Sequence, residues 1–236
     1  MGRSRKAVGL YGSRGFESHP LRQVVKRANC FLNSFMDYKL VLGTLAIVIG
    51  IIGYIPYFRG IFLNTIKPHI FSWFAWGLLE AIAFFAQISK GAGAGAWATG
   101  LTALICFTVA GLSIVKGEKQ ITRSDWLSFA GALLGIIAWQ TTKNPLTAVI
   151  LVSLVDAVAF IPTFKKAFNK PQQESVFTFS SSIIKLTISL FALESYSLTT
   201  WLYPATIVLT NTLFVTMLLF RRRAQNKIKP LTINFL

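Results

Sequence analysis

Three ionisable side chains, Glu80, Asp156 and Lys185, lie inside long apolar stretches of this sequence. At the centre of a helix in lipid, such a charge costs about 2.5–3.5 kcal/mol on insertion scales. We therefore expect all three side chains to face other protein groups or a wet cavity, where they could bind a solute or a proton.

Glu80 and Lys185 are also candidates for an ion pair. Each lies midway along its apolar stretch, and the two stretches correspond in the internal repeat described below, offset by one residue. One interpretation is that the pair neutralises itself and pins two halves of the protein together. Another is that it binds a solute or a proton, and a third is that the two charges have independent roles. A buried pair is in any case weak evidence for stability.

Polar side chains recur at helical spacing around both charges. The two stripes are Trp73, Trp76, Glu80 and Gln87, and Thr178, Ser181, Ser182, Lys185 and Ser189. Such stripes either line a wet cavity or bond to neighbouring helices. Asn211, between two threonines, can offer two donors and one acceptor to a solute. The candidate solute-binding residues are therefore Trp76, Glu80, Asp156, Ser182, Lys185 and Asn211.

No catalytic constellation accompanies these residues. The two histidines are His19 and His69, one near the N-terminus and one at a segment boundary. Their positions argue against a metal site and against a histidine-based triad. An intramembrane enzyme is disfavoured, because two ionisable groups that pair with each other leave few free acids or bases. We predict a protein that is not an enzyme and has no cofactor.

The composition indicates the solvent in which these residues lie. Apolar residues make up 53% of the 236, charged residues 14%, and the mean hydropathy is +0.57, too apolar for one water-soluble core. The formal net charge of +16 resides mainly in the first 39 residues, in short connections and after Phe220. That distribution is typical of a protein in a lipid bilayer and argues against nucleic acid as a partner.

Seven apolar segments have about the length that a helix needs to cross a bilayer. We place them at 40–57, 69–88, 95–115, 126–142, 146–163, 175–194 and 199–220. The fourth holds Gly131 and Gly135 in a small-xxx-small pattern that favours close helix packing, and it suits a linker helix. The connections are too short for a second soluble domain.

Lys and Arg are distributed unequally between the two sets of connections. If the segments alternate in direction, one side carries thirteen of them and the other carries Lys39, Lys90 and Lys143. The thirteen are Arg59, Lys67, Lys116, Lys119, Arg123, Lys165, Lys166, Lys170, Arg221, Arg222, Arg223, Lys227 and Lys229. Basic loops stay in the cytoplasm, so we expect the cell membrane, an outside N-terminus and a cytoplasmic C-terminus.

Residues 1–35 differ from the rest of the chain. They hold seven Lys or Arg, no sustained periodicity and no apolar stretch of signal-peptide length. Residues 15–22 resemble a translated 3′ end of a transfer-RNA gene, and an outside basic segment would weaken the charge asymmetry. We expect a spurious or disordered segment with Met36 as the start, and the alternative is a basic tail on anionic lipid.

An internal repeat relates the first and second halves at an offset of 106 residues. Ile55, Pro56, Phe58 and Phe62 match Ile161, Pro162, Phe164 and Phe168, and Phe71, Phe85 and Ala86 match Phe177, Phe191 and Ala192. Because the offset spans four segments, an even number, the two halves enter the membrane in the same direction. The predicted fold is all-α, with seven transmembrane helices as two parallel three-helix repeats joined by a linker helix.

A proline near the end of the first helix of each repeat, followed by a basic loop, resembles the PQ-loop superfamily, which includes the SWEET and semiSWEET transporters. The family's glutamine after the proline is replaced by Tyr57 and Thr163. Its third-helix asparagine matches Asn211, whereas Ile105 occupies the aligned place in the first repeat. The resemblance implies a solute site between the repeats, with the sugar or amino-acid class left open.

The two prolines, Pro56 and Pro162, are the candidate hinges. Each removes a backbone donor near the same end of a helix and thereby favours a kink. Kinks are also common in membrane helices that do not move, so the symmetry of the two positions is the argument for a gate.

These observations predict a multi-pass membrane transporter that moves a small polar solute by alternating access. The alternative is a non-transporting receptor or assembly partner of the same fold. Besides the solute and the lipid bilayer, a second copy of the chain is a candidate partner. The expected segments are an N-terminal segment, a first repeat, a linker helix, a second repeat and a basic cytoplasmic tail, at 1–35, 36–118, 119–143, 144–220 and 221–236.

Overall fold

The computed structural model describes residues 19–66, 68, 70–117, 123–169 and 171–232, and it divides into two compact units, 1–36 and 37–236. In the first unit the described residues belong to helix α1 (His19–Phe62). Residues 19–35 are therefore helical, and residues 1–18 of the predicted N-terminal segment lie outside the described part. Pro20 sits in the first turn, where its missing N–H costs no hydrogen bond, so it does not prevent the helix.

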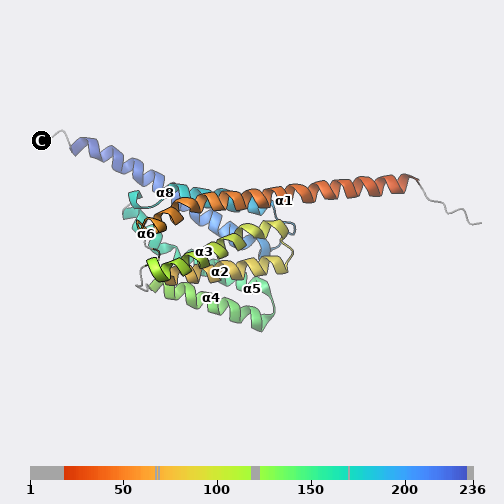
Figure 1. The fold of residues 1–236 in the computed structure, drawn as a ribbon, viewed down its shortest axis with the longest axis horizontal. Coiled ribbons are helices and arrows are strands. Elements are labelled where there is room, and N and C mark those ends of the chain that lie inside the picture. Colours follow the sequence, from red (N-terminus) through yellow and green to blue (C-terminus); the bar gives the residue numbers. More distant parts are fainter. Residues whose placement is uncertain (1–18, 67, 69, 118–122, 170, 233–236) are drawn as a thin grey trace, which may run out of the picture. The chain divides into compact units, whose positions relative to one another are not determined.

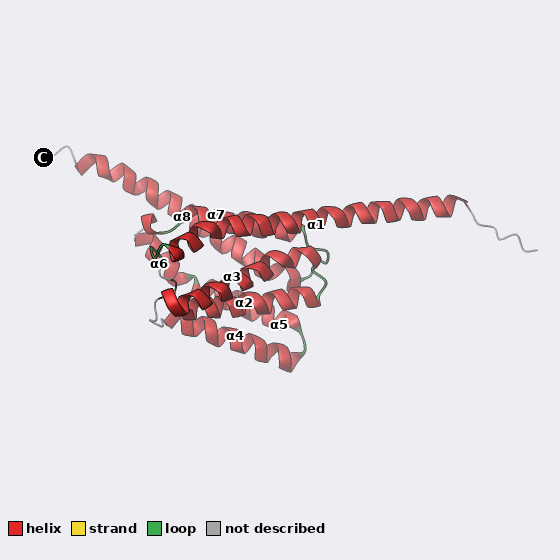
Figure 2. Ribbon diagram, in the orientation of Figure 1, coloured by secondary structure: helices red, strands yellow, loops and turns green. Residues whose placement is uncertain are grey.

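All regular structure in the described part of the second unit is helical (Figure 1), and short loops join the helices (Figure 2). After α1 come α2 (Ile70–Ser89), the 3₁₀ turn η1 (Gly93–Ala96), α3 (Trp97–Lys116), α4 (Arg123–Thr142), α5 (Pro145–Ala159), α6 (Ile161–Asn169), the 3₁₀ turn η2 (Pro171–Gln173), α7 (Val176–Phe191) and α8 (Leu198–Thr232).

Five described helical stretches are long and apolar enough to cross a membrane, judged by length and composition. They are Tyr38–Phe62, Ile70–Ser89, Gly93–Lys116, Pro145–Asn169 and Leu198–Gln225. Large apolar side chains also point outward, including Leu104 at 67% exposure and Val115 at 86%. Helices satisfy their own backbone hydrogen bonds, as a bilayer requires. The chain is therefore an all-α, multi-pass membrane protein. The predicted fourth and sixth spans correspond to α4 and to the shorter α7.

Small residues let the helices approach closely. A Cβ added to Gly131 of α4 would collide with Val155 of α5, and one added to Gly135 would lie 3.1 Å from Val152. The small-xxx-small face predicted for α4 therefore packs on α5. Ala132 joins the main core, which α2, α5 and α8 complete with Leu79, Val149 and Tyr203 among others.

Helix α1 packs against α3 and α7 through two further glycines. A Cβ on Gly50 would lie 3.1 Å from Leu101 and 3.3 Å from the Lys185 stem, and one on Gly53 would lie 2.8 Å from the Ser181 hydroxyl. Larger residues at either position would push α7 away from α1. These glycines thus bring the side chains of α7 up to those of α1.

The two candidate hinge prolines behave differently. The predicted fifth span, 146–163, is broken at Phe160 into α5 and α6, because Pro162 has no N–H to offer Val158 and its ring crowds that carbonyl. Pro56 stays inside the continuous α1. Helix α8 continues to Thr232, beyond residue 220, where the apolar segment ends.

Basic side chains fasten one end of the bundle, which we call the basic end, where α1 and α6 end and α2 and α7 begin. Lys116 donates to the Phe62 carbonyl, Arg221 to that of Phe168 and Arg222 to that of Pro171. Cations suit these positions, because carbonyls at helix C-termini lack intrahelical partners. Part of the basic charge at this end therefore has a structural role.

Candidate functional site

A cavity of about 590 Å³ lies within the second unit, between α1, α2, α3, α5, α6, α7 and α8. That volume lies in the range typical of small-molecule sites. At the basic end its lining includes Ile66, Pro68, Glu174 and Ser175, which belong to the connections before α2 and α7. No residue of the connections at the opposite end, 90–96 and 192–197, belongs to the lining. The cavity therefore extends from the middle of the bundle to the basic end.

All six residues predicted from the sequence as solute-binding lie in the lining of this cavity. They are Trp76 and Glu80 on α2, Asp156 on α5, Ser182 and Lys185 on α7, and Asn211 on α8. In the sequence these residues are spread over separate segments, and the fold brings them together around one cavity.

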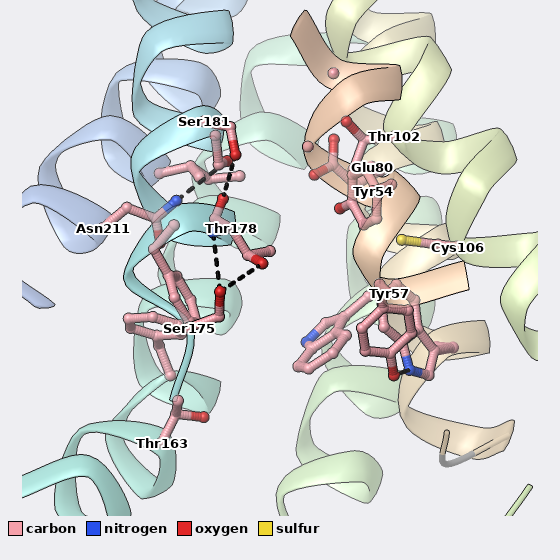
Figure 3. Close-up of a pocket in the computed structure, with 18 of the residues that line it drawn as sticks. Tyr54, Tyr57, Glu80, Thr102, Cys106, Thr163, Ser175, Thr178, Ser181 and Asn211 are labelled. Carbon is pink, nitrogen blue, oxygen red and sulfur yellow. Dashed lines mark hydrogen bonds between the residues drawn. The ribbon is translucent and has the colours of Figure 1, made fainter. Parts of the chain in front are cut away.

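The cavity has two chemically different walls, which Figure 3 shows facing each other. One wall carries hydroxyls and an amide from α7 and α8. Ser175 accepts from Thr178 N–H, and the Asn211 amide donates to the Ser182 hydroxyl at 3.2 Å. The other wall carries Tyr54, Tyr57, Glu80, Thr102 and Cys106. A solute between them would meet hydrogen-bonding groups on one side and rings with a carboxyl group on the other.

The proposed direct ion pair between Glu80 and Lys185 is not formed. The Lys185 ammonium instead donates to the Thr102 hydroxyl at 2.6 Å and lies 5.4 Å from the centre of the Tyr54 ring. The Glu80 side chain is buried, with 8% exposure, and its Oε2 has no hydrogen-bond partner. Thr102 was not among the residues predicted from the sequence. Its hydroxyl, and not the Glu80 carboxylate, is the partner of the Lys185 ammonium.

The two polar stripes each divide between the cavity and the opposite end of the bundle. On α7, residues up to Lys185 line the cavity, whereas Ser189 donates to the Gly95 carbonyl. On α2, Trp73, Trp76 and Glu80 line the cavity, whereas Gln87 donates to the Thr200 carbonyl at 2.9 Å. Both alternatives considered for the stripes therefore occur, one at each end.

Buried hydrogen bonds hold that opposite end, which we call the closed end, together. Besides those of Gln87 and Ser189, the Lys39 ammonium donates to the Leu193 carbonyl at 2.6 Å. The backbone N–H of Glu194 donates to the Ala92 carbonyl at 3.1 Å. These contacts join α1, the segment around η1 and the segment between α7 and α8. No lining residue of the cavity lies among them.

Of the two candidate hinges, Pro56 does not border the cavity. The Pro56 side chain is exposed on the outer face of α1. The Pro162 side chain lies outside the described ones, although its neighbours Phe160 and Thr163 line the cavity. Of the two prolines, Pro162 is the one beside a break in a helix that contributes to the site.

Sequence reasoning missed several lining residues that look like ordinary membrane residues. Tyr54, Thr102 and Tyr203 line the cavity, and the Tyr203 phenol is close enough to interact with the Glu80 carboxyl. The internal repeat relates one of them to another lining residue. Tyr54 lies 106 residues before Phe160, and both positions line the cavity.

Comparisons of the chain with protein-family models, with curated proteins and with solved structures find no match. Function must therefore be inferred from the cavity itself.

Proposed function

We propose that this membrane protein transports a small polar solute by alternating access, with the cavity as the solute site. The observation that carries the proposal is the asymmetry of the bundle: the cavity reaches the basic end, whereas buried hydrogen bonds join the closed end. A transporter resting with its site open to one side has this arrangement. Rearrangement of the closed-end contacts would then expose the same site to the other side.

We further propose the 3+1+3 arrangement, with α1–α3 and α5–α8 as the repeats and α4 as the linker. Helix pairing supports it. In the first repeat α3 packs against both α1 and α2, and in the second α8 packs against both α5 and α7. Between the repeats, the contact of α1 with α7 corresponds to the contact of α5 with α2. The contact of α3 with α7 corresponds in the same way to the contact of α8 with α2. A pseudo-twofold axis relates each of these contacts to its counterpart.

The lining itself supports the same symmetry. Seven pairs of positions separated by 106 residues line the cavity from both halves: 50 and 156, 54 and 160, 57 and 163, 68 and 174, 72 and 178, 73 and 179, and 76 and 182. The residue types differ within every pair. Equivalent positions therefore face one cavity while the two halves supply different chemistry, as a site for an asymmetric solute requires.

The family and the orientation complete the proposal. The repeat, the paired prolines and Asn211 support a PQ-loop, SWEET-like transporter. The thirteen basic residues counted on one side support a cytoplasmic C-terminus, an outside N-terminus and residence in the cell membrane. With that orientation, the cavity opens to the cytoplasm.

Uptake into liposomes tests the proposal. The purified chain is reconstituted, and radiolabelled sugars and amino acids are offered in counterflow. We expect saturable uptake of at least one solute, which Asn211→Leu reduces about tenfold or more because a buried amide that holds the solute is lost. Thr212→Val is the matched control, since its hydroxyl is exposed and bonds to Val208 of its own helix. Binding without uptake would instead support a non-transporting receptor of the same fold.

A further inference from the structure

The lining of the cavity has an excess of acidic groups in a strongly basic protein. Of the eight Asp and Glu in the chain, Glu80, Asp156 and Glu174 line it. Of the 24 Lys and Arg, Lys185 is the lining residue among those described. Electrostatic potential inside a low-dielectric cavity follows the groups that line it, so this cavity favours positive charge although the whole chain is +16.

Lys185 forms no ion pair with Glu80 or Asp156. Its ammonium is engaged by Thr102 and by the face of Tyr54. Glu80 keeps a buried oxygen without a partner, and the side chain of Asp156 makes no hydrogen bond within the described part of the chain. Leaving a buried carboxyl oxygen unpaired is costly. A bound group with N–H donors and a positive charge would remove that cost.

Aromatic rings beside the carboxyl groups suit the same kind of ligand. Trp73 packs against Tyr57, Tyr54 and Trp76, with centroid distances of 5.0, 6.4 and 5.6 Å respectively. All four residues line the cavity. The faces of such rings attract cations, and indole attracts them most strongly. The hydroxyl wall opposite, seen in Figure 3, offers hydrogen bonds to a polar remainder.

From these groups we infer that the transported solute carries an ammonium group, which binds at Glu80 and Asp156 beside the aromatic rings. The inference rests on the proposed function, because it takes the cavity as the solute site. A neutral sugar of similar size could use the hydroxyl wall, but it would leave the acidic excess uncompensated. Binding of the ammonium group therefore defines the class of solute, and the hydroxyl wall forms hydrogen bonds with the rest of the molecule.

Pairs of compounds that differ by one group test the inference. Glucosamine and glucose, ethanolamine and ethylene glycol, and alanine and lactate each exchange an ammonium for a hydroxyl. Binding to the purified full chain in detergent is followed by tryptophan fluorescence, since Trp73 and Trp76 line the cavity, and by thermal shift. We expect at least one amine to bind about tenfold or more tightly than its hydroxyl partner, as charge-assisted hydrogen bonds predict.

Two variants assign the preference to the carboxyl groups. Glu80→Gln and Asp156→Asn should each reduce binding of the amine about tenfold while leaving binding of the hydroxyl partner unchanged. Two positions are used because either variant alone could fail to fold, which the thermal shift would reveal. Glu194→Gln, which removes an exposed charge outside the cavity, is the control and should keep the preference.

Three results would overturn the inference. In the first, hydroxyl compounds bind as tightly as their amine partners, or no amine binds at millimolar concentration. In the second, the preference survives in both variants. In the third, Na⁺ alone gives a saturable response that both variants abolish and that amines do not compete with. Uptake is measured separately. If the chain binds amines but does not transport them, only the proposed transport is contradicted. If it transports neutral solutes without a preference for amines, only the proposed ammonium preference is contradicted.

Discussion

Lys185 connects three helices through one buried ammonium. It reaches from α7 to the Thr102 hydroxyl on α3 and to the ring of Tyr54 on α1. Glu80 nevertheless remains within electrostatic range across the cavity. The lysine therefore holds α7 to α1 and α3, and its charge also contributes to the electrostatic potential of the cavity.

The Thr102 hydroxyl should contribute to stability through this lysine. Thr102→Val removes the acceptor of a buried ammonium, which we expect to lower the free energy of unfolding by about 1–3 kcal/mol. Thr108→Val is the control. The Thr102 and Thr108 hydroxyls each donate to a carbonyl of their own helix, at Ala98 and Leu104 respectively, but Thr108 is exposed. This control should change stability by less than about 0.5 kcal/mol. Unfolding in mixed micelles with rising dodecyl sulfate measures both, and equal losses would show that Lys185 gains nothing from Thr102.

A double-mutant cycle should rank the two partners of Lys185. Coupling between Lys185→Met and Thr102→Val should exceed coupling between Lys185→Met and Glu80→Gln. Groups in contact couple by about 0.5–3 kcal/mol, whereas Glu80 acts without a direct hydrogen bond. The same unfolding assay gives both values. A larger coupling with Glu80 would indicate that the two charges pair directly in the membrane.

Single residues could be predicted from the sequence where their chemistry conflicts with an apolar segment. Glu80, Asp156, Lys185 and Asn211 stood out for that reason, and each lines the cavity. Thr102 and Tyr54 did not stand out, because hydroxyls and tyrosines are ordinary in membrane helices. The choice of Thr102 over Glu80 as the lysine's partner depends on side-chain distances, which spacing along a helix does not determine.

At the scale of helices and loops, the closed end depends on close backbone packing. Gly91 and Gly93 adopt φ values of +70° and +58°, which L side chains rarely adopt, and they turn the chain from α2 into η1. A Cβ on Gly95 would lie 2.7 Å from the Leu193 backbone. The segment between α7 and α8 can therefore lie directly on the turn before α3.

Substitution of Gly95 should loosen this end. Gly95→Ala forces the Leu193 backbone away, and we expect a loss of about 1–3 kcal/mol in the free energy of unfolding, as in other overpacked sites. Gly111→Ala is the control within α3, because nothing lies within 4 Å of its added Cβ. It should be neutral or stabilising by up to about 1 kcal/mol. A destabilised Gly111→Ala with an unaffected Gly95→Ala would contradict the packing described here.

Helix positions could be predicted well from hydropathy, whereas helix ends could not. The small face of α4 was predicted from Gly131 and Gly135 and does pack on α5. The break at Phe160 was missed, although Pro162 was noted as a candidate hinge. Pro56, noted for the same reason, lies in the unbroken helix α1. Proline alone thus does not say whether a helix bends or stops. The continuation of α8 to Thr232 was missed because polarity ends an apolar segment without ending a helix.

At the scale of the whole molecule, the orientation of the chain can be tested directly. Green fluorescent protein fused after Leu236 should fluoresce, and alkaline phosphatase fused after Lys143 should be active, because the first folds in the cytoplasm and the second outside it. The exchanged fusions are the controls and should both be inactive. Active phosphatase at the C-terminus would reverse the orientation and would place the opening of the cavity outside.

The repeat predicts a symmetric bundle, and this symmetry stays a prediction, whereas nothing in the sequence indicated the state of the cavity. An offset of 106 residues between matching segments indicated two parallel halves, and lining positions such as 73 and 179 follow the same offset. Which end is closed depends on contacts such as that of Lys39 with Leu193, between residues far apart in sequence.

Alternating access is tested most directly by the accessibility of the cavity from the two sides of the membrane. Ser182→Cys is made with Cys30 and Cys106 replaced by serine, and a membrane-impermeant thiol reagent is applied to either side of oriented vesicles. Thr212→Cys, on the exposed face of α8, should react from neither side. We predict that position 182 reacts from both sides, faster from the basic end, and that solute changes the ratio of the two rates. Reaction from the basic end alone, with and without solute, would contradict alternating access.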